Sequence, residues 1–171
     1  MHMRKLLILV TFSVSVLSFN SALYAQNKLI ILVRHAEKAA LESAGNPDPE
    51  LSEAGKQRAE RLVKVIGRYR PGAVYSTNYR RTRDTVTPIA NKRKKPVQIY
   101  DPSRPQDLLA EIMSSKTKRF VIAGHSNTVP GLANLITKKD IFKNLQESEY
   151  TVIWLIRIKN GAVTEVRLLD Y

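Results

Sequence analysis

The stretch Leu29-Ile30-Ile31-Leu32-Val33, followed directly by Arg34-His35, decides the fold of this 171-residue chain. Five consecutive apolar residues are typical of a β-strand that is covered on both faces, as strands are in a parallel sheet flanked by helices. The polar pair after the run places a guanidinium and an imidazole where such a strand ends. The sequence downstream supplies the remaining strands and the partners of these two side chains.

Strand and helix patterns alternate after this first run. Further strands are predicted at residues 73–76, 97–100, 119–123, 151–158 and 162–169. A first helix is predicted to begin after Ser52 and to end near Gly67 or at Pro71-Gly72, and further helices are predicted at residues 80–90, 106–113 and 129–136. Ser52 is suited to cap the first helix, and Pro88 is expected to kink or restart the second. Asn160-Gly161 predicts a β-hairpin between the last two strands. The expected fold class is therefore α/β: a three-layer sandwich with a mostly parallel central sheet flanked by helices and a C-terminal antiparallel hairpin at the edge.

The first 25 residues have the layout of a secretory signal peptide. Arg4 and Lys5 form a short positive region, an apolar run spans residues 6–19, and small residues end the segment at Ala25. The run is shorter than the roughly 20 apolar residues that a transmembrane helix needs. We therefore expect cleavage after Ala25, export to a periplasm or to the exterior, and one domain at residues 26–171. An uncleaved N-terminal anchor is the alternative.

The chain is strongly basic and lacks cysteine. It has 28 Lys and Arg residues against 15 Asp and Glu, a formal net charge of +13, which favours anionic partners. The absence of cysteine excludes disulfides, thiolate metal sites and a cysteine nucleophile. The run Lys92-Arg93-Lys94-Lys95 predicts either a solvated loop or a contact with an anionic envelope surface. We expect no nucleic-acid partner because no recognition motif is present.

The histidines are few and placed where ligands bind in α/β folds. The chain has three of them; His2 lies in the predicted signal peptide, whereas His35 and His125 each follow a predicted strand. The carboxyl ends of parallel strands meet at one edge of the sheet, so both imidazoles can converge there. Arginines at the start of the second helix, Arg80, Arg81 and Arg83, reach the same edge. Guanidinium groups suit phosphoryl oxygens, and nearby cations keep an imidazole neutral and nucleophilic.

Four ordered segments resemble one known family. They are Arg34-His35-Ala36-Glu37, Leu51 to Ala59, Tyr75 to Thr85, and Gly124-His125-Ser126-Asn127-Thr128. In this order they are similar to motifs of the histidine phosphatase superfamily, the phosphoglycerate mutase-like proteins, whose usual first motif is Arg-His-Gly-Glu. The chain resembles a short, single-domain, exported member, with Ala36 as its departure from the pattern.

The resemblance implies a role for each matching residue. His35 would be the phosphorylated nucleophile, Arg34 and Arg81 would clamp the phosphoryl oxygens, and His125 would complete the pocket. Arg81 is preferred to its neighbours because it lies five residues after Ser76 and four before Thr85, as the family pattern requires. Further expected contacts are a substrate hydrogen bond from Asn127, a substrate contact from Glu37, and a general acid at Asp101, with Asp107 and Glu37 as alternative acids.

These assignments predict a metal-independent phosphatase without a cofactor. It would hydrolyse a phosphomonoester or phosphoramidate through a phosphohistidine, acting on a phosphorylated small molecule or a phosphoprotein. A mutase is disfavoured because the segment after the second helix is short and the chain ends after its hairpin. The alternative is a non-catalytic module of the cell envelope that binds phosphate ligands without cleaving them.

Overall fold

The computed structural model describes residues 27–39 and 47–171. The predicted signal peptide, and with it the alternative of an anchor, lies outside the described residues. Within the two described ranges no helix is both long and apolar enough to cross a membrane.

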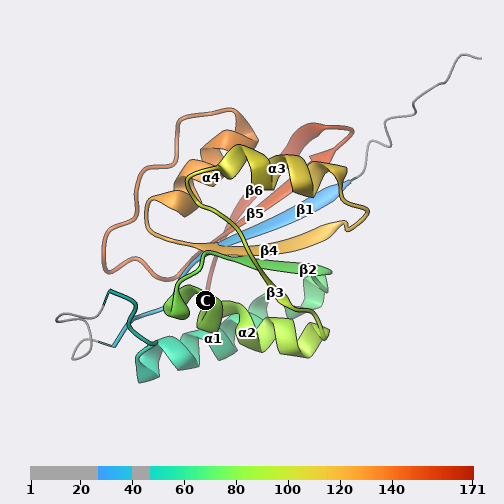
Figure 1. The fold of residues 1–171 in the computed structure, drawn as a ribbon. Coiled ribbons are helices and arrows are strands. Elements are labelled where there is room, and N and C mark those ends of the chain that lie inside the picture. Colours follow the sequence, from blue (N-terminus) through green and yellow to red (C-terminus); the bar gives the residue numbers. More distant parts are fainter. Residues whose placement is uncertain (1–26, 40–46) are drawn as a thin grey trace, which may run out of the picture.

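The centre of the fold is a mixed six-stranded sheet (Figure 1). Its strands are β1 Lys28–Arg34, β2 Ala73–Ser76, β3 Val97–Ile99, β4 Arg119–Gly124, β5 Val152–Lys159 and β6 Ala162–Asp170, in the order β3-β2-β4-β1-β5-β6. The first four strands are parallel to one another, whereas β5 runs antiparallel to β1 and forms a hairpin with β6. The predicted α/β class, the mostly parallel sheet and the antiparallel edge are confirmed.

Helices cover both faces of the sheet. They are α1 Glu53–Ile66, α2 Arg80–Arg93, α3 Pro105–Ser114 and α4 Thr128–Thr137, and a 3₁₀ turn, η1 Gly67–Tyr69, follows α1. Helices α1 and α2 share one face, and α3 and α4 share the other (Figure 1). The three predicted layers are therefore present.

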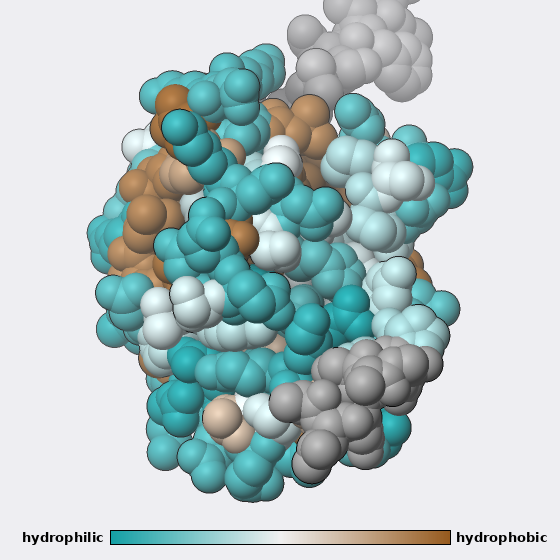
Figure 2. All heavy atoms as spheres, turned by 90° about the vertical axis from the view of Figure 1, so that its left-hand side faces the viewer, coloured by the Kyte–Doolittle hydropathy of each residue, from teal (hydrophilic) through white to brown (hydrophobic). Residues whose placement is uncertain are grey.

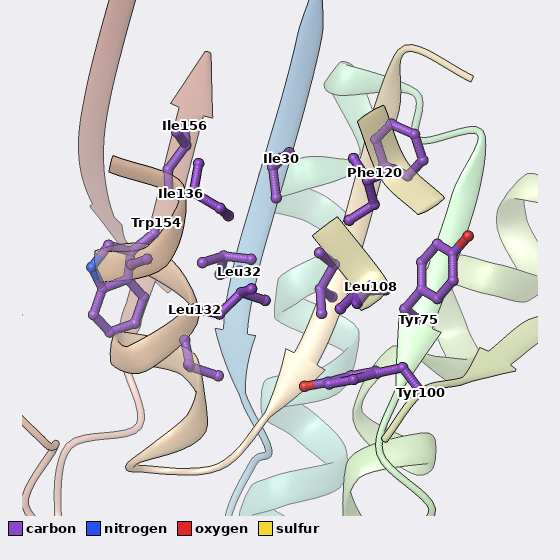
Figure 3. Packing of buried hydrophobic residues seen from close by; sticks show 14 of the residues in the cluster. Ile30, Leu32, Tyr75, Tyr100, Leu108, Phe120, Leu132, Ile136, Trp154 and Ile156 are labelled. Carbon is purple, nitrogen blue, oxygen red and sulfur yellow. The ribbon is translucent and has the colours of Figure 1, made fainter. Parts of the chain in front are cut away.

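Strand β1 lies in the middle of both hydrophobic layers. Ile30 and Leu32 point into the cluster beneath α3 and α4, while Leu29, Ile31 and Val33 belong to the cluster beneath α1 and α2. All five are at most 5% exposed, which explains why the run is continuously apolar instead of alternating. Figure 3 shows the first cluster, in which aromatic rings from three other strands surround the β1 side chains.

The boundaries of two helices follow from local chemistry. The hydroxyl of Ser52 accepts a hydrogen bond from the N–H of Gly55 at 3.1 Å, which confirms the predicted N-cap of α1. Helix α2 contains Pro88 but is not restarted there, and it continues to Arg93 instead of ending at Ala90. The prediction of a restart is wrong because the buried face of the helix packs on the sheet on both sides of the proline.

The carboxyl edge of the parallel strands, where ligands were expected, forms one side of the molecule. Figure 2 views the protein from this side, and hydrophilic residues dominate the middle of that face. Residues that directly follow β1, β2 and β4 therefore lie next to a polar surface that faces solvent, whereas the strands themselves lie between apolar layers.

Gly55 is required for the close approach of α1 to the segment after β1. A Cβ atom at this position would lie 2.2 Å from the carbonyl oxygen of Glu37. We expect Gly55→Ala to lower the free energy of unfolding by about 1–3 kcal/mol, because backbone has to move to remove the overlap. Urea unfolding followed by circular dichroism measures this change.

Gly131→Ala in α4 is the matched control, since a Cβ there meets nothing within 4 Å. Alanine favours a helix over glycine by up to about 1 kcal/mol, so this variant should be as stable as the wild type or more stable. Equal stability of the two variants would contradict the close approach described for Gly55.

Candidate active site

His35 is held at the end of β1 with one ring nitrogen engaged. Its backbone N–H donates to the carbonyl of Gly124 at 2.8 Å, and its side chain is 5% exposed. Nδ1 lies 2.8 Å from the carbonyl oxygen of Ala36. A carbonyl only accepts hydrogen bonds, so this contact assigns the proton to Nδ1 and leaves the lone pair on Nε2. Nε2 of His35 is therefore available as a nucleophile, because only Nδ1 is hydrogen-bonded to the backbone.

His125 lies beside His35, as the strand-end positions predicted. The two ring centroids are 5.3 Å apart in an edge-on arrangement. Its Nε2 is 2.9 Å from the hydroxyl oxygen of Thr77, and its backbone N–H donates to the hydroxyl of Thr128 at 2.8 Å. Thr77 follows β2 and Thr128 begins α4, so the segments after β1, β2 and β4 together fix the geometry of the histidine pair.

Both imidazoles are neutral at physiological pH. Burial lowers the pKa of His35 from 6.5 to about 4, against the opposing effect of the hydrogen bond to Ala36, and nearby Arg81 adds to the lowering. Burial followed by the charges of Arg81 and Arg34 lowers the pKa of His125 to about 4 as well. A neutral imidazole retains the lone pair that a nucleophile needs.

Arg34 is a buried cation, only 1% exposed, held by the segment before β5. Its Nη1 donates to the carbonyl oxygens of Gln146, Glu147 and Glu149 at 2.6, 3.2 and 3.1 Å. Its Nη2 donates to the carboxylate of Glu147 at 2.8 Å, and the guanidinium lies over the ring of Tyr150. The buried Nε–H has no hydrogen-bond partner among the described residues.

Arg81 enters the site from the first turn of α2. Its side chain is 15% exposed, Nη1 lies 3.7 Å from a carboxylate oxygen of Asp48, and the guanidinium stacks over Tyr79. Like that of Arg34, its buried Nε–H has no partner in the described part of the chain. Arg34 and Arg81 line the same cavity, and guanidinium groups suit phosphoryl oxygens, so the pair favours an anionic ligand between them.

A cavity of about 420 Å³ joins these groups. Its lining consists of Arg34, His35, Lys38, Tyr79, Arg81, Pro102, His125, Ser126, Asn127, Thr128 and Glu147. The structure thus brings together five of the predicted site residues: Arg34, His35, Arg81, His125 and Asn127. A larger groove of about 710 Å³ lies between α1 and α2 and contains no histidine. Among the described residues, no group of three or more His, Asp and Glu side chains is arranged to hold a metal ion.

The predicted carboxylates lie elsewhere. Asp101 accepts hydrogen bonds from the N–H and hydroxyl of Ser103, and it lines a separate cavity with Asp107. Glu37 receives Nε and Nη2 of Arg58 at 2.7–3.0 Å, and these contacts help to hold its pKa below the usual value although burial opposes this shift. The structure brings none of the three to the histidines. The general acid and the substrate contact of Glu37 stay predictions that this arrangement does not favour.

Glu147 is the site residue that sequence reasoning missed. Of the described residues, it is the carboxylate that lines the cavity, and it is paired with Arg34 at 2.8 Å and Lys38 at 3.3 Å. The hydrogen bonds and charges of Lys38 and Arg34 hold its pKa below the usual value, although burial acts in the opposite direction. It belongs to a segment without helix or strand, so no periodicity marked it. Thr77 and Tyr79, by contrast, lie inside a segment that the resemblance had already singled out.

Comparisons with known proteins agree with this geometry. The model of the histidine phosphatase superfamily (branch 1) matches residues 30–108, which include the Arg34-His35 pair and Arg81. No curated protein matches the chain in sequence. Among solved structures, the protein histidine phosphatase SixA complexed with tungstate has a TM-score of 0.68 at 13% identity, covering 83% of this chain and 96% of that one.

Two further structures share the fold. A mycobacterial glucosyl-3-phosphoglycerate phosphatase has a TM-score of 0.65 at 16% identity, with coverage of 84% of this chain and 98% of that one. A mutant phosphoserine phosphatase of Entamoeba histolytica in complex with phosphoserine has a TM-score of 0.64 at 15% identity, with coverage of 81% and 96%. At such identities the likeness establishes the fold. Together with the family match over residues 30–108 and the motifs at the cavity, it confirms the resemblance of this chain to the histidine phosphatase superfamily.

Proposed function

We propose that this chain is an exported, metal-independent phosphatase that works through a phosphohistidine on His35. One observation supports this above all: the free Nε2 of a neutral, buried His35 opens into a cavity that also contains Arg34, Arg81 and His125. The structural neighbours include a protein histidine phosphatase and two phosphatases of small molecules, and these activities support the same reaction class. Export rests on the N-terminal sequence alone.

In the first step, the Nε2 lone pair of His35 forms a bond to phosphorus. The bond from phosphorus to the leaving oxygen or nitrogen breaks, and the leaving group keeps the electron pair and takes up a proton. Arg34 and Arg81 balance the charge on the phosphoryl oxygens, and such placed donors act strongly in a partly dehydrated site. In the second step, water attacks phosphorus, the P–N bond breaks, and inorganic phosphate leaves a neutral His35.

The cavity favours a leaving group that departs without a strong acid. Glu147 is the one carboxylate among the described residues that line it; it is ion-paired with Arg34 and Lys38, and a lowered pKa makes it a poor proton donor at neutral pH. Phosphoramidates, such as a phosphorylated histidine, expel a nitrogen that is readily protonated by solvent. We therefore propose phosphoramidates and esters of acidic alcohols ahead of simple alkyl phosphates, in a small molecule or on a protein.

Substitution of the nucleophile and of one clamp tests the activity. With EDTA present, His35→Ala should abolish both turnover of p-nitrophenyl phosphate or phosphoramidate and an alkali-stable, acid-labile phosphoenzyme. Arg81→Ala should lower kcat/KM by about 100-fold, the usual effect of removing one charge-stabilising donor. Steady-state assays and acid-quench trapping with ³²P-labelled substrate measure these effects.

Arg83→Ala is the matched control, because its guanidinium is two residues further along α2 and bonds to Asn78 outside the cavity. It should keep activity within about twofold, as expected for a surface substitution that leaves the transition-state contacts intact. Tungstate or phosphate binding by the wild type without turnover of any phosphoramidate or ester would contradict the enzyme and support the phosphate-binding module.

The pKa of each histidine can be measured directly. We expect the imidazole resonances of His35 and His125 to remain neutral at pH 5.5 and to titrate near pH 4 in the ligand-free protein. NMR of the imidazole protons suits this test, because the chain has only three histidines and single substitutions assign them. Titration of either site residue near 6.5 would contradict the burial of a neutral pair.

The same shifts predict how stability depends on pH. The folded pKa values lie below that of an unfolded histidine, so the unfolded chain binds more protons between pH 6.5 and 4. The free energy of unfolding should therefore fall as the pH drops through this window. His35→Asn should reduce the slope, which urea unfolding at pH 7, 5.5 and 4.5 measures, whereas His2→Asn in the same chain should not.

Glu147 should compete with the substrate for Arg34. Glu147→Gln removes a carboxylate that an incoming phosphate must displace, and an exposed pair of this kind contributes up to about 1 kcal/mol. We expect tungstate and phosphate to bind about two- to fivefold more tightly to this variant by calorimetry. Asp107→Asn removes one negative charge outside the cavity and controls for net charge. A large fall in kcat for esters with Glu147→Gln would instead identify Glu147 as the acid.

A further inference from the structure

Positively charged residues gather at the amino ends of the parallel strands, opposite the cavity. Three adjacent strands, in the order β3-β2-β4, are each preceded by exposed basic residues. We call these six residues the basic edge: Arg68 and Arg70 before β2, Lys94 and Lys95 before β3, and Lys116 and Lys118 before β4. The strands are parallel, so all six lie at the amino ends of the strands, away from His35 and His125.

Hydrogen bonds join the three loops into one surface. The Nε of Arg93 donates to the carbonyl of Pro71 at 3.1 Å, which ties the loop before β3 to the loop before β2. The Nε of Arg119 donates to the carbonyl of Arg70 at 3.1 Å, and the N–H of Gly72 donates to the carbonyl of Arg119 at 2.8 Å. The basic edge is therefore a continuous part of the fold with a defined shape.

The positive charge of this surface is not balanced locally. None of its six residues forms an ion pair with another residue of the described ranges. The sequence contains no Asp or Glu at residues 61–83, 85–100 or 112–139, which include all three loops. Glu111, at the end of α3, is engaged with the hydroxyl of Tyr75 at 2.6 Å. Like charges gathered in this way attract an extended anionic partner.

The path of the chain points to a lipid surface as that partner. β1 begins at Lys28 and pairs with β4 from Leu29 and Arg119 onward, so the chain enters the fold at the same edge as the basic loops. Eight residues, 20–27, separate the apolar run at residues 6–19 from Lys28. Eight linking residues span at most about 30 Å. If the apolar run inserts into a bilayer, whether before cleavage or as an anchor, the basic edge is brought close to the headgroups.

The cavity and the basic edge lie at opposite ends of the parallel strands, so contact of the basic edge with a membrane leaves the cavity accessible. Strand β4 separates the basic edge from His125 by six residues, a distance of about 20 Å. We propose that the basic edge docks against anionic phospholipid headgroups and leaves the cavity open on the side away from the membrane. The inference does not depend on the phosphatase activity, because none of its residues lines the cavity.

Vesicle binding by the full chain tests the docking surface. The edge variant combines two charge reversals at the basic edge, Lys94→Glu and Lys118→Glu. The control variant combines Lys56→Glu and Lys143→Glu, which change the net charge by the same amount at exposed lysines outside the edge. The readout is the ratio of binding to vesicles with 30% phosphatidylglycerol over pure phosphatidylcholine, a ratio that cancels the apolar contribution of residues 6–19. Thermal unfolding by circular dichroism confirms that both variants are folded.

The wild type should prefer anionic vesicles, and the preference should weaken with salt. In the edge variant the ratio of binding to anionic over neutral vesicles should fall by at least about tenfold, since each basic residue near such a surface adds substantially to binding. The control variant should keep it within about twofold to threefold, because net charge alone acts weakly through salt. An equal loss in both variants, or no preference in the wild type, would overturn the proposal. Edge-dependent binding to soluble polyphosphate without vesicle preference would also overturn it, in favour of a polyanion ligand.

Discussion

The parallel pairing of β1 with β4 is the constraint on which the site depends. Six consecutive residue pairs, ending at Arg34 and Gly124, bring the ends of the two strands level. The hydrogen bond from the N–H of His35 to the carbonyl of Gly124 continues this ladder one step past the strands. A shift of one residue would exchange the faces of every β1 side chain and separate the two histidines, so the apolar run fixes the catalytic register. The core and the site are specified by the same residues.

The site places charged and polar groups where burial is costly. Arg34 is almost fully buried, and three carbonyl oxygens and one carboxylate compensate the loss of water around its guanidinium. Two imidazoles avoid this cost by remaining neutral. The unmatched Nε–H groups of Arg34 and Arg81 retain part of it. The rigid apolar layers on both faces of β1 make such an arrangement stable without a ligand.

Patterns in the sequence were sufficient for the fold and for the residues at strand ends. Apolar runs identified the strands, and the rule that ligands bind at their carboxyl ends placed His35, His125 and Arg81 together. The family resemblance was needed to choose Arg81 from three nearby arginines. Only the restart at Pro88 was wrong, because tertiary packing can outweigh one missing hydrogen bond in a helix.

The carboxylates could not be predicted because their orientation depends on partners distant in sequence or on local turns. Glu37 is bound by Arg58, 21 residues away, and Glu147 reaches Arg34 across 113 residues from a segment without periodicity. Asp101 turns toward Ser103 two residues on, a local preference of aspartate in loops that competed with the strand-end rule. Residue type and position therefore predicted where the arginine side chains lie better than where the carboxylate side chains lie.

Two groups of positively charged residues in the chain act independently. Arg34 is buried and Arg81 is only 15% exposed, and after burial itself the charges of these two arginines lower the pKa of His125. The basic edge is exposed and lies about 20 Å away, more than twice the Debye length of about 8 Å at physiological salt. Its charge is therefore screened before it reaches the histidines. A substitution at the edge can change what surface the protein binds while the chemistry of the cavity stays the same, and the central sheet is what keeps the two apart.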